Sequence, residues 1–387
     1  MFDLFELHDP KYDTRSRGWI RFGGTRLIKE AQNIFTEVSN SYGSMRQISI
    51  LLSRDLKISY HTIYKYLMEI KNDKWYSKKN CIPLPILKSL INTMSLKNQE
   101  KRKWKIINAT EFLVTGAPRS KPVKAVHFLT HELAKIAGAH AADGTLVMAE
   151  SGSNSHMYRW VVTDGNIYSL SSLQKWVKSS FGINIKIKKS PYDNSFLFIV
   201  DNKVITRYLN RFFGFKFGDK TKVATIPKII NKSSFKFKRN FALGVLTFDG
   251  SIDLDGNLRL NIKSNKLLSS VADIMQKDGL KITFPKTTKK RGWTLKCKIS
   301  ENGRDVLNYF DKDSVNWRKA YGFLYGFNKN EAIQLFKRTP ISKITLRKFI
   351  ETQKRLNTSN KRMLAKNLGV NIRTIRKYTN LCKLIKS

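Results

Sequence analysis

An internal repeat in residues 128–325 constrains this chain more than any other feature. Two segments, LAKIAGAHAADGTL (133–146) and FALGVLTFDGSI (241–252), each place small and apolar residues at helical spacing and then reach Asp-Gly. The two aspartates, Asp143 and Asp249, are 106 positions apart. Strand-like and helix-like stretches follow each Asp-Gly in the same order. The repeat therefore predicts two successive halves that each run α-β-β-α-β-β-α.

Glycine recurs at the same place in both predicted helices, at Gly138 and Gly244. Small residues at helical spacing allow two helix backbones to approach closely. If these helices lie side by side, Asp143 and Asp249 meet at their C-terminal ends, where the helix dipole and the second carboxylate both disfavour negative charge. A divalent cation resolves this conflict. The alternative interpretation is that each Asp-Gly only forms the turn that ends its helix.

The two aspartates are therefore candidate catalytic residues and metal ligands. Mg²⁺ prefers carboxylate, water and phosphate oxygens, and a pair of bound metals stabilises both the attacking and the leaving oxygen of an in-line displacement. We expect phosphodiester hydrolysis with Mg²⁺ as cofactor, for which Mn²⁺ can substitute. Two further Asp-Gly pairs, at 164–165 and 255–256, favour hairpin turns over metal ligands.

The nine-residue segments IAGAHAADG (136–144) and ALGVLTFDG (242–250) resemble the LAGLIDADG motif of homing endonucleases. The stretch FGFKFGDKTKVATIPKII (213–230) also resembles the segment before the second motif in the two-motif branch shared with inteins. At the first acidic position of the motif this chain has Ala141 and Thr247, and that position is not the metal ligand of the family. The resemblance implies a duplicated core of antiparallel sheet saddles about a pseudo-twofold axis, and site-specific cleavage of both DNA strands.

By the same resemblance, each half carries a basic residue near its end that orients water or neutralises charge developing on the phosphate. Lys220 matches this place in the first half, with Lys222 as the alternative, and Lys319 matches it in the second half. Because lysine is abundant in this chain, a solvated surface position is the competing interpretation for each of them.

The predicted strands NLRLNIK (257–263), WTLKCKI (293–299) and INIKIKK (183–189) alternate apolar with basic or polar residues. Successive side chains of a strand point to opposite faces, so one face is buried while the other carries donors suited to guanine edges and phosphates. Any soluble antiparallel sheet also has a polar outer face. We expect DNA contacts from Arg259, Asn261, Lys263, Lys186, Lys188, Lys296 and Lys298.

Helix-turn-helix patterns occur near both ends of the chain. Residues 44–70 contain two short amphipathic helices, with His61 and Lys65 on the outer side of the second, although an ordinary helical hairpin has the same pattern. In KRMLAKNLGVNIRTIRKYTN (361–380), Gly369 suits the turn, because a helix commonly ends at a residue that tolerates positive φ. We expect this second pair to contact DNA through Arg373, Arg376 and Lys377.

These features predict an α+β chain in which the duplicated α-β-β-α-β-β-α core is flanked by all-α helix-turn-helix domains. The connector is expected at 96–127, where charged residues are followed by a stretch with Gly, Pro and Ser. The expected divisions are an N-terminal helical domain at 1–95, a linker at 96–127, repeat halves at 128–228 and 229–328, and a C-terminal domain at 340–387 whose helix pair spans about 360–381.

Charge points to the partner. Lys and Arg number 72 against 29 Asp and Glu, a formal net charge of +43, which destabilises the folded chain unless a polyanion neutralises it. Nucleic acid is the expected polyanion, and double-stranded DNA with a long asymmetric site suits two unequal halves. We expect no membrane partner and no disulfide framework, since the three cysteines are far apart. The same cysteine pattern indicates a reducing, cytoplasmic setting. A monomer is expected because the duplication supplies both halves.

Four functions fit a fold of this kind. A DNA endonuclease is favoured because both aspartates are present. An RNA maturase that binds its host intron RNA is the main alternative, since intact acids do not exclude it. A transcription regulator would be expected to lack the acids. An intein would need a nucleophile at its start and a His-Asn end, whereas this chain opens with Met1 and ends with Lys386-Ser387.

Overall fold

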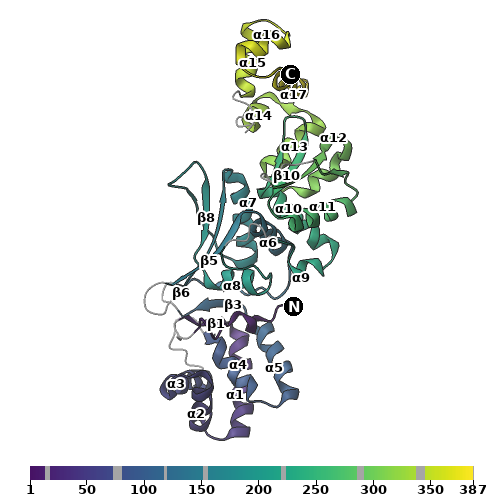
Figure 1. The fold of residues 1–387 in the computed structure, drawn as a ribbon. Helices are drawn as coiled ribbons and strands as arrows, with labels where there is room; N and C mark the ends of the chain where they lie inside the picture. The colour runs from purple at the N-terminus through teal and green to yellow at the C-terminus, as the bar shows by residue number, and fades with distance from the viewer. Residues whose placement is uncertain are drawn as a thin grey trace.

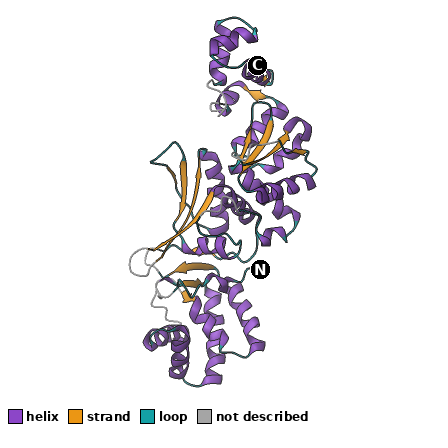
Figure 2. Cartoon of the chain, viewed as in Figure 1, coloured by secondary structure: helices purple, strands orange, loops and turns teal. Residues whose placement is uncertain are grey.

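The computed structural model describes residues 1–13, 18–72, 81–116, 120–150, 156–218, 224–285, 292–336 and 345–386. The predicted α+β class is confirmed: three four-stranded antiparallel sheets and one short parallel pair lie among helices in this part of the chain. The molecule is elongated, with the N-terminal helices at one end, two sheet-and-helix bodies in the middle and the C-terminal helices at the other end (Figure 1). Figure 2 shows the sheets separated by helices along this length.

The N-terminal body combines helices with one sheet in the strand order β2-β1-β3-β4. Its elements are η1 (Leu4–Leu7), β1 (Ile20–Gly23), α1 (Thr25–Tyr42), α2 (Met45–Leu56), α3 (Tyr60–Asn72), β2 (Cys81–Pro83), α4 (Leu84–Asn92), α5 (Leu96–Ala109), β3 (Phe112–Thr115) and β4 (Val123–Lys124).

Two expectations for this region are wrong. The body is not all-helical, and residues 96–127 are not a linker, because β3 from this stretch lies between β1 and β4 in the sheet. Ile106 and Ile107 of α5 are fully buried, and α5 packs on α1 and α4. The charged run that suggested a connector is the solvent-facing side of this amphipathic helix, and charge alone does not distinguish such a face from a linker.

The first central half follows the predicted order of elements. It consists of α6 (His131–Asp143), β5 (Gly144–Glu150), β6 (His156–Asp164), α7 (Ile167–Phe181), β7 (Ile187–Lys189), β8 (Phe196–Val200) and α8 (Lys203–Arg211). Its sheet has the order β5-β6-β8-β7. The strand expected at 183–189 pairs with β8 only over Ile187–Lys189, opposite Phe196–Phe198.

The second central half repeats this topology, with the sheet order β9-β10-β12-β11. Its elements are α9 (Lys228–Asn231), α10 (Phe235–Phe248), β9 (Gly250–Ile252), β10 (Asn257–Ile262), α11 (Asn265–Lys277), β11 (Ile282–Thr283), β12 (Trp293–Lys298), α12 (Ile299–Asn302), η4 (Gly303–Tyr309) and α13 (Val315–Tyr325). In β10 the buried Leu258 and Leu260 alternate with the more exposed Arg259 and Asn261, as a half-buried strand requires.

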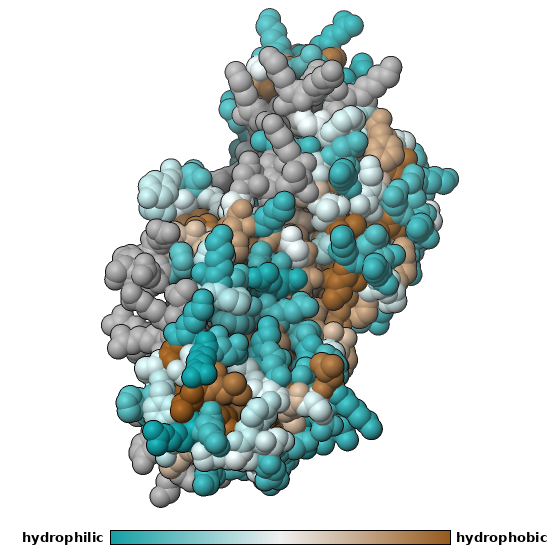
Figure 3. Space-filling model, turned by 60° about the horizontal axis from the view of Figure 1, so that its bottom comes forward, coloured by the Kyte–Doolittle hydropathy of each residue, from teal (hydrophilic) through white to brown (hydrophobic). Residues whose placement is uncertain are grey.

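One hydrophobic core runs continuously from the N-terminal body through both central halves, and includes Phe22, Trp160 and Leu246. The first residues of the chain contribute to it, since Phe2 stacks on Phe212 with ring centroids 4.5 Å apart. The face of the molecule in Figure 3 carries hydrophilic side chains over most of its area, with apolar groups in separate patches. No described helix is long and apolar enough to cross a bilayer.

The C-terminal body has a separate small core, which also includes Leu254 of the second half. It comprises β13 (Phe327–Asn328), α14 (Lys329–Leu335), α15 (Leu346–Arg355), α16 (Lys361–Leu368), α17 (Ile372–Cys382) and β14 (Ile385–Lys386). Because β13 pairs in parallel with β14, this body begins near residue 327 rather than at 340.

Candidate metal centre and nucleic-acid interface

The two motif helices, α6 and α10, are in backbone contact. A Cβ atom added at Gly138 would lie 2.1 Å from the carbonyl oxygen of Phe241, and one at Gly244 would lie 2.2 Å from the carbonyl oxygen of Lys135. No side chain larger than hydrogen fits at either position, since real Cβ contacts this short essentially do not occur. The two helices therefore cross at the paired glycines.

Each helix ends at its aspartate. Asp143 is the last residue of α6, and Asp249 caps α10, donating its backbone N–H to the carbonyl of Val245 at 2.9 Å. Both residues are half-buried. The glycine after each acid is required by space, because a Cβ at Gly144 would lie 2.6 Å from His140 Cα and one at Gly250 would lie 2.3 Å from the Leu246 carbonyl oxygen.

Asp164 and Ser169 lie between the C-terminal ends of the two helices. The carboxyl group of Asp164 lies beside the Ser169 hydroxyl and close enough to Asp143 for the two charges to interact. The Ser169 Oγ donates to the carbonyl oxygen of Thr247 at 3.2 Å, two residues before Asp249. The ends of α6 and α10 that carry Asp143 and Asp249 therefore lie on the same side of the crossing.

Asn316 contacts the end of α10 from the second half. Its Nδ2 donates to the carbonyl oxygen of Gly250 at 2.8 Å and to that of Leu246 at 3.4 Å. It lies in the first turn of α13, whose start is fixed by the Ser314 hydroxyl, which accepts from the Trp317 N–H at 3.1 Å. The helix end next to Asp249 is thus held by side chains from both halves.

Sequence reasoning missed Asp164 as a member of this site. Asp164-Gly165 was expected to form a hairpin turn, but Asp164 ends β6 and the chain then enters α7, which Asn166 caps. Burial raises the pKa of Asp164 to about 7, and the charge of Asp143 adds to this, against hydrogen bonds from the Asn166 N–H and Ser169. The one sequence signal was Asn166, two positions later, because Asn is a preferred residue at the start of a helix.

The donor set at these helix ends suits a hard divalent cation bound jointly with a substrate. The described residues include no cluster of three or more His, Cys, Asp or Glu side chains that could hold a metal by themselves. Two half-buried carboxylates would fill only some of the coordination positions of such a cation, and the others would remain for oxygens of water and substrate. Mg²⁺ commonly binds in this way, through one or two carboxylates together with water and phosphate oxygens.

Of the basic residues expected beside the acids, Lys319 is the one within the described part of the chain. Lys319 Nζ lies 5.0 Å from the centroid of the Phe336 ring in the C-terminal body. Burial lowers its pKa to about 8, against the opposing effect of the Asp253 carboxylate. The hydrogen bonds described above come from Asn316, one turn earlier in α13. Lys220 and its alternative Lys222 fall outside the described residues.

Most of the sheet residues expected to contact DNA are accessible. Lys186, Lys188, Asn261, Lys263 and Lys298 are exposed. Lys296 is half-buried and faces Arg259 across the β10–β12 pair. Arg259 is partly engaged within the protein, because its Nε donates to Asp253 Oδ2 at 2.7 Å. The Asn261 side chain also accepts a hydrogen bond from the Thr294 hydroxyl at 2.5 Å.

Both expected helix pairs are present as short helices. In the first, α2 and α3, His61 and Lys65 are exposed, and so is Leu51 of α2, at 38%. In the second, α16 ends at Gly369, with φ of 61°, before α17 begins.

The basic residues of α17 differ in their surroundings. Arg373 and Arg376 are exposed, whereas Lys377 forms an ion pair with Asp255 in the β9–β10 turn. Lys377 is therefore partly engaged within the protein, as Arg259 is.

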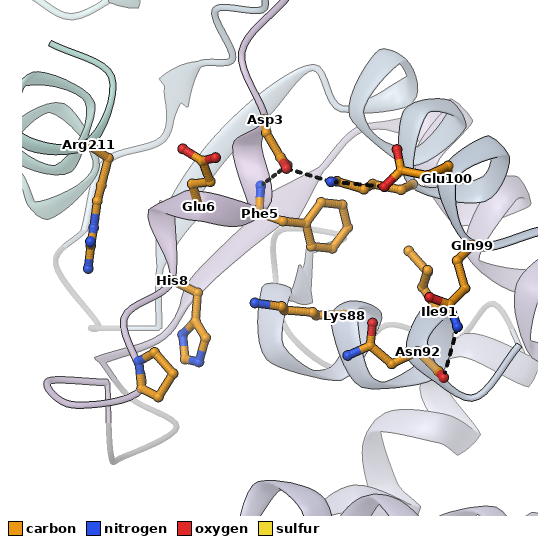
Figure 4. A pocket seen from close by; sticks show the side chains of 12 residues that line it. Asp3, Phe5, Glu6, His8, Lys88, Ile91, Asn92, Gln99, Glu100 and Arg211 are labelled. Carbon is orange, nitrogen blue, oxygen red and sulfur yellow. Dashed lines mark hydrogen bonds and ion pairs between the residues drawn. The ribbon is translucent and has the colours of Figure 1, made fainter. Parts of the chain in front are cut away.

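A hollow beside η1 is a separate feature that contains none of the expected site residues. It is lined by side chains of η1, α4 and α5 together with Arg211 (Figure 4). Three of its charged side chains pair with one another, since Lys103 Nζ contacts Asp3 Oδ2 at 2.6 Å and Glu100 Oε1 at 3.5 Å. We do not assign it to the site.

No protein-family model matches the sequence, and no curated protein matches it. Among solved structures, the homing endonuclease I-DmoI in complex with DNA and Mn is similar with a TM-score of 0.35 and 18% identity, over 44% of this chain and 91% of that one. A mutant of I-SmaMI has a TM-score of 0.34 and 12% identity, over 51% and 89%. Full-length DUF199/WhiA from Thermatoga maritima has a TM-score of 0.31 and 13% identity, over 67% and 93%.

Proposed function

We propose that this protein is a site-specific double-strand DNA endonuclease of the LAGLIDADG homing type. The observation that carries the proposal is the pair of Asp-Gly helices in backbone contact, with Asp164 and Ser169 lying between their aspartate-bearing ends. If each Asp-Gly only formed the turn that ends its own helix, the two helices would not need to be in backbone contact. The identical strand order of the two sheets supports the same interpretation.

In this proposal Asp143 and Asp249 hold divalent metal at the DNA backbone, one acid serving each strand. Mg²⁺, or Mn²⁺ in its place, would stabilise the attacking and leaving oxygens of phosphodiester hydrolysis. The protein supplies the arrangement: the glycine crossing fixes the distance between the helix ends, and the half-buried position of each acid favours sharing of a cation over separate solvation. A second protein copy is unnecessary, since one chain carries both acids.

The basic strand faces are proposed to lie in the major groove on either side of the acids. Arg259, Asn261, Lys263, Lys296 and Lys298 serve the second half, and Lys186 and Lys188 serve the first. Arginine and asparagine can read base edges, while lysine neutralises phosphates. The helix pairs that carry His61, Lys65, Arg373 and Arg376 would extend the contact to a long asymmetric duplex.

Cleavage of a randomised duplex library tests the proposal, with the wild-type protein compared with the Asp143→Asn/Asp249→Asn double variant in Mg²⁺ and in Mn²⁺. We expect discrete double-strand cuts by the wild type alone and equal duplex binding by both proteins. Salt-sensitive binding without cleavage in either metal would overturn the endonuclease. Preferential binding of structured intron RNA over duplex DNA would then favour a maturase.

A further inference from the structure

We propose that Ser169 and Asn316 are positioning residues for Asp249, and that they set the rate at which one of the two DNA strands is cut. The inference rests on the proposed endonuclease function. Neither residue touches the reacting atoms in this scheme. Each holds a backbone carbonyl beside Asp249, so that the carboxylate stays where the metal and the phosphate need it.

The end of α10 requires such support for a physical reason. The last four carbonyl groups of any helix lack partners within the helix, and the negative end of the helix dipole repels a carboxylate. A helix terminus that is not held tends to fray. An acid at that terminus would then sample several positions. Carbonyl groups that accept hydrogen bonds from fixed side chains prevent this.

Ser169 provides the first support. Its side chain is buried, with 3% of the residue exposed, and Oγ donates to the Thr247 carbonyl at 3.2 Å. Ser169 lies in the first turn of α7, so it belongs to the first half, while Thr247 belongs to the motif helix of the second half. The hydroxyl also lies beside the carboxyl group of Asp164.

Asn316, which belongs to the second half, provides the second support. Its Nδ2 donates at 2.8 Å to the carbonyl oxygen of Gly250, which follows Asp249 in the sequence, and at 3.4 Å to that of Leu246. Together the two side chains hold carbonyls before and after Asp249. A shift of Asp249 therefore requires that at least one of these hydrogen bonds break.

The end of α6 is followed by a longer paired strand than the end of α10. The Gly144 N–H donates to the His140 carbonyl, and β5 begins at Gly144 itself and pairs with β6 along its length. Backbone pairing continues directly from each aspartate into its sheet, but β5 pairs with β6 over Gly144–Glu150, whereas β9 pairs with β10 only over Gly250–Ile252. Loss of Ser169 or Asn316 should therefore disturb Asp249 much more than Asp143, and the two strands of the target should respond unequally.

The test uses the full chain and its duplex target with each strand labelled separately. Asp249→Asn first identifies the strand that depends on this acid. In Ser169→Ala and in Asn316→Asp, which lacks the donor, we expect cleavage of that strand to slow by roughly 10- to 100-fold, the scale at which small displacements act. The other strand should change by less than about twofold, and duplex affinity should be unchanged.

Two further variants separate positioning from general stability. Ser171→Ala is the matched control, because the Ser171 hydroxyl donates within α7, to the Ile167 carbonyl at 2.9 Å. It should cut both strands at the wild-type rate. Ser169→Thr keeps a hydroxyl and should recover most of the activity. Mn²⁺ binding to the protein–duplex complex, followed by electron paramagnetic resonance, should weaken at one site only in Ser169→Ala.

The contrary outcomes distinguish the positioning role from the endonuclease function. Equal slowing of both strands, or Ser169→Ala matching Ser171→Ala, would overturn the positioning role while leaving the endonuclease intact. Wild-type cleavage of both strands by Asp249→Asn would instead overturn the proposed function itself.

Discussion

At the scale of single residues, Asp13 is a buried carboxylate whose charge is compensated by neighbouring basic groups. Its carboxylate is fully buried and contacts His8 Nδ1 at 3.2 Å, the Lys203 ammonium, and Arg207 Nη2 at 3.7 Å. Burial alone would raise the pKa of Asp13, but His8, Lys203 and the Asp9 N–H lower it to about 2. The stabilisation is therefore complete above pH about 4 and lost towards pH 2, a decrease of about 2–3 kcal/mol in the free energy of unfolding.

Replacement of Asp13 by Asn should remove this acid-dependent decrease. It should also destabilise the protein at pH 7 by about 3–5 kcal/mol, because the buried Lys203 and Arg207 lose a partner. Urea unfolding at pH 7, 4 and 2 measures both effects. Asp201→Asn is the control, since the pair of Asp201 with Arg159 is largely exposed and should contribute less than about 1 kcal/mol. An unchanged acid profile in Asp13→Asn would contradict this account.

At the scale of elements, the crossing of α6 and α10 determines the site. Gly138→Ala would place a Cβ 2.1 Å from the Phe241 carbonyl oxygen, so the helices must separate. Overpacking of this kind costs about 1–3 kcal/mol, which exceeds the roughly 1 kcal/mol that alanine gains in helix propensity. We therefore expect a lower free energy of unfolding by urea denaturation, together with slower cleavage of both strands.

The chain offers a matched glycine for this experiment. A Cβ at Gly165 would meet no atom within 4 Å, so Gly165→Ala should leave both stability and cleavage close to the wild type. If Gly138→Ala proved as stable as Gly165→Ala, the backbone contact between the two helices would be refuted.

At the scale of the whole molecule, a net charge of +43 is distributed so that some cations already have partners. The β9–β10 turn holds Arg259 through Asp253 and Lys377 through Asp255. Arg376 is exposed on the same helix as Lys377. We expect Arg376→Ala to reduce the slope of log affinity for duplex DNA against log salt concentration by about 1, the value for one lost phosphate contact.

Lys377→Ala should reduce that slope by less, because Asp255 competes with phosphate for this lysine. Fluorescence anisotropy of labelled duplex between about 50 and 200 mM salt measures both slopes. Removal of the competing acid in Asp255→Ala should strengthen binding. Equal slopes for Arg376→Ala and Lys377→Ala would show that the Asp255 ion pair does not persist on DNA.

Features that depend on local periodicity were accessible from the sequence. The motif helices are predicted by small residues at helical spacing followed by Asp-Gly, and the strands by alternation with a period of two. Each of these patterns involves residues that are close together in the sequence. The segment 96–127 shows the limit of this approach. Its charge pattern is equally typical of a connector and of an exposed helix face, and only packing against α1 and α4 distinguishes them.

By itself, the sequence determined that Asp143 and Asp249 end two helices of one kind and that Gly138 and Gly244 recur at one place in them. Only the tertiary structure decided which groups surround the acids. Ser169 meets Thr247 across 78 positions, Asn316 meets Gly250 across 66, and Lys319 lies over Phe336 of another body. The physical reason is that a side chain reaches only a few ångströms, so partners distant in sequence are chosen by how the helices and sheets pack and not by any local pattern.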